Sequence, residues 1–214
     1  MQPGPLLRAE DLLGPPEEVA PTLLGCWLVT DRPDGHVALR LTEVEAYSGN
    51  GTDPAAHSHR GPTPRAAIMF GPPGRLYVYF SYGVHWCANV VVGREGEGSA
   101  VLLRAGEIVV GEDLARSRRP AARVARDLAR GPARLSQALG IGPDDLDSDL
   151  LSESSTVRLY RGVPPASVST GPRVGISLAT DLPWRFWETD APSVSVFRAG
   201  GKPRRRTAGQ DGVP

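Results

Sequence analysis

The chain has 214 residues, enough for one domain with a sizeable apolar core, and its 24 basic and 24 acidic residues cancel at neutral pH. Its two cysteines cannot form a disulfide framework, and no apolar run has the length of a membrane span or the pattern of a secretion signal. The composition therefore excludes a disulfide-stapled scaffold and a membrane protein, and it predicts a cytoplasmic one.

Positive charge is concentrated in two segments, although the whole chain is neutral. Residues 104–134 contain eight arginines against four carboxylates, and residues 198–214 contain five basic residues against one aspartate. Such segments can bind a polyanion, or they can be a solvated helix face and a disordered tail. We expect one domain over residues 1–198 and a basic, disordered tail over residues 199–214.

The first half of the chain is predicted to be mainly β-structure. A proline-rich start with short helical pieces leads into two strands that are joined by a turn at residues 31–35. A polar loop at 48–73, with a short helix at 66–70, is long enough to indicate a functional or a disordered segment. The predicted strands lie at residues 25–29, 37–47, 75–81, 85–92 and 99–110.

The second half is predicted to begin with helices and to end with strands. Residues 111–139 have a helical pattern that Pro120 splits, and Pro132 begins a second helix that stops at Gly140. Strands are predicted at 156–161 and 173–178, with a loop at 164–172 and an aromatic core cluster at 184–187. Where the helix is continuous, one basic stripe is formed by Arg116, Arg119, Arg123, Arg126 and Arg130.

Two carboxylates lie in the strand predicted at 37–47. With strict alternation, Glu45 shares a face with Leu39 and Leu41. A carboxylate rarely stands on an apolar face unless it is paired or chemically active. The alternative is that Glu43 and Glu45 lie beyond the edge of the sheet, in water.

A tight hairpin is predicted between the strands at 75–81 and 85–92. Tyr82 and Gly83 form its turn, which places a large aromatic side chain at or near the tip. Hairpin tips favour small polar residues. A tyrosine at this position is therefore unusual, although Tyr77, Tyr79 and Tyr82 could also belong to an ordinary amphipathic strand.

The sequence gives little support to chemistry by a metal or by a lysine. His57 and His59 could form a metal pair, but no further ligands follow at the spacing of a zinc site, and we predict no metal. Lys202 is the only lysine and lies in the tail. A Schiff base on a lysine of the folded domain is therefore excluded.

Eight short motifs resemble one known family when they are taken together and in order. They are EVEAY at 43–47, AAHS at 55–58, LYVY at 76–79, YG at 82–83, CAN at 87–89, VLLRA at 101–105, GPARL with QAL at 131–139, and RVG at 173–175. The family is that of the alkyladenine (3-methyladenine, methylpurine) DNA glycosylases. The resemblance extends from about residue 20 to residue 198.

The resemblance implies a fold and an activity. The fold is a single α+β domain with a curved antiparallel sheet, flanking helices and a protruding β-hairpin that intercalates into DNA. The activity is that of a monofunctional enzyme, without metal or organic cofactor, that flips a damaged purine (3-methyladenine, 7-methylguanine, hypoxanthine or ethenoadenine) out of duplex DNA. It hydrolyses the N-glycosidic bond and leaves an abasic site for base excision repair. The expected partner is damaged double-stranded DNA, bound by a monomer in the cytoplasm, or at the nucleoid if the source is bacterial.

The matching positions imply the roles of single residues. Glu45 matches the general base, which such a reaction needs because positive charge develops at C1′ of the sugar. Arg104 matches the residue that helps to hold the water and this carboxylate, and Tyr82 matches the wedge that fills the gap in the duplex. The substrate-binding positions are matched by Tyr47, His57, Tyr79, Leu102 and Asn89, and Asn89 matches the residue that discriminates against guanine through its exocyclic amine.

Two other functions remain open from the residues themselves. In a non-catalytic nucleic-acid-binding domain, the basic stripe and the tyrosines would contact phosphates and bases. A nucleoside hydrolase acting on free ribosides would use a similar carboxylate but would not need Tyr82 at a tip or the basic stripe. Release of a base from damaged DNA separates the glycosylase from the binding domain.

Overall fold

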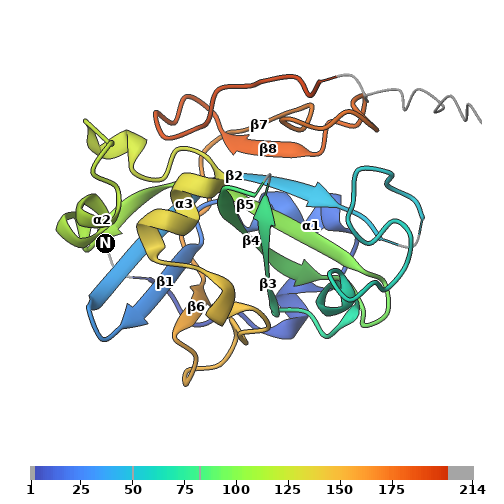
Figure 1. Cartoon of the computed structure of the whole chain (residues 1–214), viewed down its shortest axis with the longest axis horizontal. Helices are drawn as coiled ribbons and strands as arrows, with labels where there is room; N and C mark the ends of the chain where they lie inside the picture. The colour runs from blue at the N-terminus through green and yellow to red at the C-terminus, as the bar shows by residue number, and fades with distance from the viewer. Residues whose placement is uncertain (1–2, 50, 82, 202–214) are drawn as a thin grey trace, which may run out of the picture.

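The computed structural model describes residues 3–49, 51–81 and 83–201, and in this part eight β-strands form one antiparallel sheet. The strand order is β3-β4-β5-β2-β1-β6. Strand β8 pairs with the part of β2 that extends past the first residue of β1, and on its other side it pairs with β7. Figure 1 shows the curved sheet with α3 in front of it and with β7 and β8 along the top of the molecule. The strands are β1 Trp27–Arg32, β2 Gly35–Tyr47, β3 Leu76–Ser81, β4 His85–Val92, β5 Ser99–Val110, β6 Val157–Tyr160, β7 Val168–Gly171 and β8 Arg185–Glu188.

Short helices flank this sheet, which confirms the predicted α+β class. Residues described by the structure form three α-helices, namely α1 Pro16–Thr22, α2 Glu112–Arg118 and α3 Pro132–Leu139. The 3-10 turns are η1 Ala9–Leu12, η2 Ala67–Phe70, η3 Ala125–Asp127 and η4 Pro143–Asp145. As predicted, α3 begins at a proline that needs no N–H partner and ends at Gly140, whose φ of 68° suits the left-handed stop of a helix.

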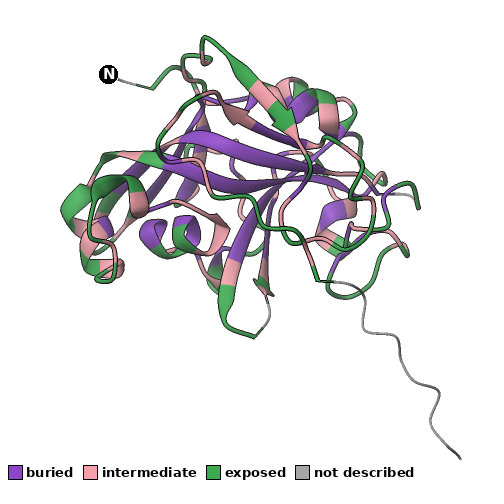
Figure 2. Ribbon diagram, turned by 90° about the horizontal axis from the view of Figure 1, so that it is seen from above, coloured by how far each residue is buried: buried purple, intermediate pink, exposed green. Residues whose placement is uncertain are grey.

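The main apolar core lies on one face of the sheet. Helices α1 and α3 contribute Val19, Leu135 and Leu139 to it, and they pack against the inward side chains of the central strands. Figure 2 shows these strands as the buried centre of the molecule. A smaller cluster around Met69 and Tyr77 lies on the opposite face, beneath η2. The candidate site is on this second face.

Two of the three register shifts in the β2–β5 pair decide which face the side chains of the site reach. Leu41 pairs with Gly106 and Glu43 pairs with Ala105, so Thr42 is an extra residue on β2. Similarly, Val44 pairs with Leu103, so Arg104 is an extra residue on β5. Each extra residue reverses the alternation of the strand that carries it.

The bulge on β2 overturns the prediction that Glu45 shares a face with Leu39 and Leu41. The core contains these two leucines before the bulge but Val44 and Ala46 after it. Glu45 therefore points away from the core, on the face of the smaller cluster. The alternative, that this carboxylate lies in water beyond the sheet, is also wrong because its side chain is fully buried.

Three predictions about the second half are wrong. No strand forms at residues 173–178, where Gly175 has a φ of 75° that breaks an extended chain. Strands form instead at β7, inside the predicted loop, and at β8, inside the predicted aromatic cluster. The basic stripe does not exist as one helix face because α2 ends at Arg118, just before Pro120.

The predicted hairpin is present as β3 and β4, with Ser81 paired to His85. Gly83 has a φ of 67°, which glycine adopts without strain in the turn. The strand pair is buried at its base and exposed at its outer end, where Figure 2 shows it extending from the body. Tyr82, the predicted wedge, lies outside the described residues, as does most of the predicted basic tail at 199–214.

Candidate active site

Arg104 lies between the two buried carboxylates of β2. Its Nε donates to Glu43 Oε1 at 2.9 Å, and its Nη1 donates to Glu45 Oε2 at 3.3 Å. Both glutamate side chains are fully buried and that of Arg104 is 6 % exposed. The facing bulges create this arrangement, because they direct these three side chains to one face of neighbouring strands.

Three hydrogen-bond donors hold the Glu45 carboxylate. Besides Arg104, the backbone N–H of Val174 donates to Oε1 at 2.7 Å and the hydroxyl of Tyr47 donates to Oε2 at 2.9 Å. Burial raises the pKa of Glu45, and the charge of Glu43 acts in the same direction, while the three donors oppose it. The net pKa is raised, so Glu45 is a stronger base than an ordinary glutamate.

The neighbouring carboxylate has the opposite electrostatic balance. Burial by itself would raise the pKa of Glu43, but the guanidinium groups of Arg104 and Arg185 and the backbone N–H of Ser195 together lower it. The two glutamates therefore differ in character although they share one arginine. Glu43 is the fixed anion, and Glu45 is the group suited to accept a proton.

A cavity of about 790 Å³ lies directly beside Glu45. Its wall includes Tyr47, Arg104 and Val174, the three donors that hold the Glu45 carboxylate. The cavity is also lined by six residues that the sequence predicted for the site, namely Tyr47, His57, Tyr79, Asn89, Leu102 and Arg104. Glu45 stands immediately behind this wall.

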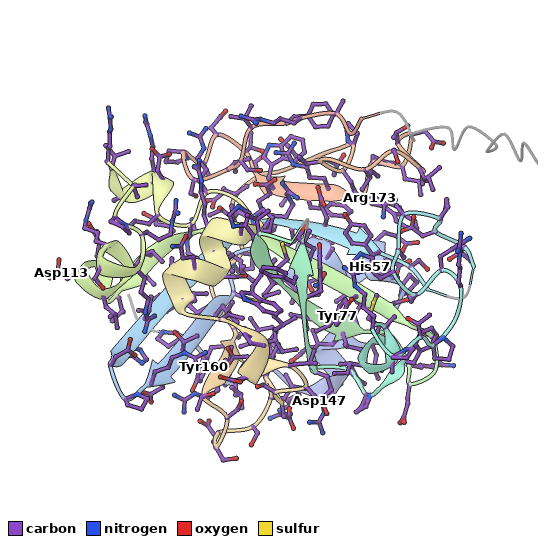
Figure 3. The ribbon with its side chains drawn as sticks, viewed as in Figure 1. His57, Tyr77, Asp113, Asp147, Tyr160 and Arg173 are labelled. Atoms are coloured by element: carbon purple, nitrogen blue, oxygen red, sulfur yellow. The ribbon has the colours of Figure 1, made fainter. Side chains whose placement is uncertain are left out.

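Flat aromatic groups form one side of the cavity. The ring of His57 meets Tyr79 edge to face at 4.6 Å, and Tyr79 is stacked on Tyr77 at 5.6 Å. The Nδ1 atom of His57 lies 3.0 Å from the Tyr77 hydroxyl, and Figure 3 shows these two side chains next to each other. The side-chain amide of Asn89 donates to the Tyr77 carbonyl at 3.0 Å, which fixes it in the cavity. Such walls suit a planar, mainly apolar ligand.

His57 is uncharged at neutral pH. Burial lowers its pKa to about 4, and the nearby Arg65 guanidinium acts in the same direction. A neutral imidazole beside two tyrosines adds a flat surface without adding charge. The positive groups of the cavity are therefore arginines.

A buried ion pair joins the two segments that close the cavity. Arg173 Nη2 donates to Asp53 Oδ1 at 2.9 Å, and both side chains are fully buried. The Arg173 guanidinium also lies over the Tyr47 ring at 4.6 Å and donates to the Ala46 carbonyl at 2.9 Å. Figure 3 shows Arg173 on the segment above His57. The pair thus fixes the segment that brings the Val174 N–H to Glu45.

Sequence reasoning missed four residues of the site: Asp53, Tyr77, Arg173 and Val174. The strand alternation of β3 could have indicated Tyr77, because it lies two residues before Tyr79. The contact of Val174 is made by its backbone, which no residue type reveals. The partnership of Asp53 and Arg173 spans 120 residues and has no signal in one sequence.

Most arginines of the predicted stripe are engaged within the protein. Arg116 pairs with Glu112, Arg119 donates to Gln137 and to the Leu128 carbonyl, and Arg130 donates to the Val194 carbonyl. Arg123 and Arg126 are exposed and lie outside α2, with Arg126 in η3. In the described part of the chain, no helix is long and apolar enough to cross a bilayer, and no group of three or more His, Cys, Asp or Glu side chains could hold a metal ion.

Comparisons with known proteins agree on one family. The model of the family described as methylpurine-DNA glycosylase matches residues 10–192. A protein of Nocardia farcinica is 49% identical over 199 residues, which cover 90% of this chain and 92% of that protein. Proteins of Streptomyces avermitilis and Leifsonia xyli are 50% and 54% identical, over 95% and 85% of this chain and 96% and 87% of their own lengths. All three are provisionally named 3-methyladenine DNA glycosylases.

Proposed function

The chain belongs to the methylpurine-DNA glycosylase family, and we propose that it hydrolyses the N-glycosidic bond of damaged purines flipped out of duplex DNA, with Glu45 as the general base. One observation carries the proposal. A fully buried carboxylate with a raised pKa is held by Arg104 directly behind the wall of an aromatic cavity. The substrates proposed are 3-methyladenine, 7-methylguanine, hypoxanthine and ethenoadenine.

The proposed reaction uses the cavity for the base and the Glu45–Arg104 pair for the sugar. As the bond from C1′ to the purine breaks, the base departs with the bonding electrons and positive charge develops at C1′. A water molecule attacks C1′ and gives its proton to Glu45, whose negative charge also stabilises the cationic sugar. The water reaches Glu45 by taking the place of one present donor, such as the Tyr47 hydroxyl. The products are an abasic site and a free base. A cationic methylated purine leaves as a neutral base and Glu45 gives its proton to solvent, whereas hypoxanthine or ethenoadenine leaves as an anion and takes up one proton.

Asn89 is proposed to exclude guanine. Its amide is tied to the Tyr77 carbonyl at 3.0 Å, so it cannot swing aside for an additional substituent. The 2-amino group of guanine would meet this fixed amide, whereas adenine-derived lesions and hypoxanthine carry no such group. The substrate 7-methylguanine does carry it, and we expect its excision to depend on the positive charge of the methylated ring, which weakens the glycosidic bond. A buried site discriminates strongly against a ligand when binding leaves a polar group without a hydrogen-bond partner.

A gel assay tests the proposed function directly. Duplexes with one hypoxanthine or one ethenoadenine, and an undamaged control, are incubated with the protein and divided into samples with and without alkali. We expect strand breaks in the damaged duplexes only after alkali, because the product is an abasic site and, among the described residues, no lysine, the usual residue for a Schiff base, lines the cavity. Binding without alkali-sensitive sites would favour the non-catalytic domain, and breaks without alkali would contradict monofunctional chemistry.

The pH dependence of excision should follow Glu45 and not His57. We expect the single-turnover rate to decrease as the pH is lowered, because protonated Glu45 cannot accept a proton. The midpoint of this acidic limb of the pH–rate profile should lie above the ordinary pKa of glutamate, because the pKa of Glu45 is raised. Tyr47→Phe removes a donor that lowers the pKa of Glu45, so the limb should move to higher pH. His57→Gln should leave the limb in place, because the pKa of His57 is about 4. A limb that follows His57 would contradict the assignment.

Tyr82 is proposed to fill the gap that the flipped nucleotide leaves. Support comes from its two neighbours in the sequence: Ser81 ends β3, Gly83 lies in the turn that follows, and both line the cavity. Tyr82→Ser should reduce excision most from stable base pairs and least from single strands, because unstacking a base costs a few kcal/mol. Ethenoadenine fluorescence should report a smaller flipped population on binding. Wild-type flipping and excision in this variant would leave the hairpin without the proposed role.

A further inference from the structure

The proposed chemistry leaves the second buried carboxylate without a task. Glu43 is as deeply buried as Glu45, and its two oxygens accept four hydrogen bonds, from Arg104, from Arg185 and from the backbone and side chain of Ser195. Burying a charge is costly, so such a group is retained where it holds other groups in place or takes part in chemistry.

Ser195 contacts all the charged groups around Glu43. Its Oγ donates to Glu43 Oε1 at 2.8 Å and accepts from Arg104 Nη2 at 3.2 Å. Its N–H donates to Glu43 Oε2 at 2.7 Å, and its carbonyl accepts from Arg185 Nη2 at 2.7 Å. Ser195 lies in the irregular segment after β8, beyond residues 10–192 that the family model matches.

These contacts leave the Arg104 guanidinium a single orientation. Its Nε is held by Glu43, its Nη2 is held by Ser195, and its Nη1 is directed at Glu45. A guanidinium is rigid and planar, so two fixed nitrogens determine where the third one points. Glu43 and Ser195, which do not line the cavity, therefore set where Arg104 Nη1 lies on the Glu45 carboxylate.

We propose that Glu43 and Ser195 are positioning residues that clamp Arg104, so that its Nη1 stays on the carboxylate of Glu45 during the reaction. The proposal rests on the proposed function, because the clamp affects excision only if Glu45 is the base. Glu43 also supplies negative charge next to the base. The other titratable or charged groups around Glu45 are Tyr47 on its own strand, Arg104 on β5, Tyr79 on β3, and Arg173.

Two serines of the same segment give a matched test. Ser195→Ala removes the hydroxyl between Glu43 and Arg104, whereas Ser193→Ala removes a buried hydroxyl that contacts Thr42 at 2.9 Å and touches neither charged group. We expect Ser195→Ala to lower the single-turnover rate by roughly 10-fold or more, with unchanged affinity for damaged duplex, because small misplacement of a catalytic group is costly. Ser193→Ala should keep both values. Equal effects of the two variants, or a loss confined to affinity, would overturn the proposal.

A second variant tests the charge of Glu43. Glu43→Gln removes the nearby negative charge that raises the pKa of Glu45 and leaves Arg104 more available to it. The acidic limb of the rate profile should therefore move to lower pH, together with a lower rate at neutral pH. A purely structural role would reduce the rate without moving the limb, and that result would overturn the positioning role of Glu43. If this variant does not fold, the serine pair decides.

Glu45→Gln in the same assay separates the two proposals. If it excises like the wild type, the assignment of the base fails, whatever the clamp does. If it is inactive while Ser195→Ala and Glu43→Gln have wild-type rates and limbs, the proposed function stands and the clamp is wrong.

Discussion

Glu45→Gln is expected to reduce the single-turnover rate of excision by roughly 10²- to 10⁴-fold, the usual contribution of a positioned general base. The substitution keeps the shape of the side chain and removes its charge. A neutral side chain is also less costly to bury than a charged one, so the fold should persist. Binding to a damaged duplex should also persist, because Glu45 lies behind the cavity wall.

The control for this variant is Glu188→Gln. Glu188 lies on β8 and pairs with Arg40 at 2.7 Å, so it too is a glutamate of the sheet held by an arginine. This variant should excise at the wild-type rate. Near-normal excision by Glu45→Gln would instead direct attention to Glu43, the other carboxylate on Arg104.

Loss of the Asp53–Arg173 pair is expected to have the largest effect on stability. Asp53→Asn leaves the Arg173 guanidinium buried without its counter-charge. Breaking one partner of a buried pair costs about 3–5 kcal/mol. For a chain of this size, the midpoint of thermal unfolding should fall by roughly 6–20 °C. Excision should also weaken, because Arg173 directs the Val174 N–H onto Glu45.

A surface pair provides the matched control for Asp53→Asn. Asp31 pairs with Arg158 at 3.1 Å, and its side chain is 57 % exposed. Asp31→Asn should unfold close to the wild-type temperature, because water replaces the lost partner. Similar midpoints for the two variants would show that the Asp53–Arg173 pair does not stabilise the fold.

The sequence predicted best where the signal is local. Alternating apolar residues located β3, β4 and β5, and Pro132 and Gly140 marked both ends of α3. The six cavity residues came from short motifs that fall on these strands, on β2 and on the loop with His57. Local pattern and tertiary structure agree in these segments.

The errors occur where distant partners decide the structure. Strict alternation misplaced Glu45, because the extra residue Thr42 becomes evident only when β2 is paired with β5. The strand β8 was missed because its four residues are stabilised by pairing with β2 and β7, which lie elsewhere in the sequence. Ser195 gave no signal at all, since one serine acquires its role only from the two charges that it touches.

The bulge at Thr42 means that the site depends on the length of a strand as much as on its composition. Deleting Val44 would remove no carboxylate, arginine or tyrosine from the protein. It would nevertheless move Glu45 into the place of Val44, whose side chain faces the apolar core. A one-residue insertion or deletion between Thr42 and Glu45 should therefore be as harmful as the loss of Glu45 itself. A relative with a different number of residues between this bulge and the glutamate that matches Glu45 would have to form this site differently.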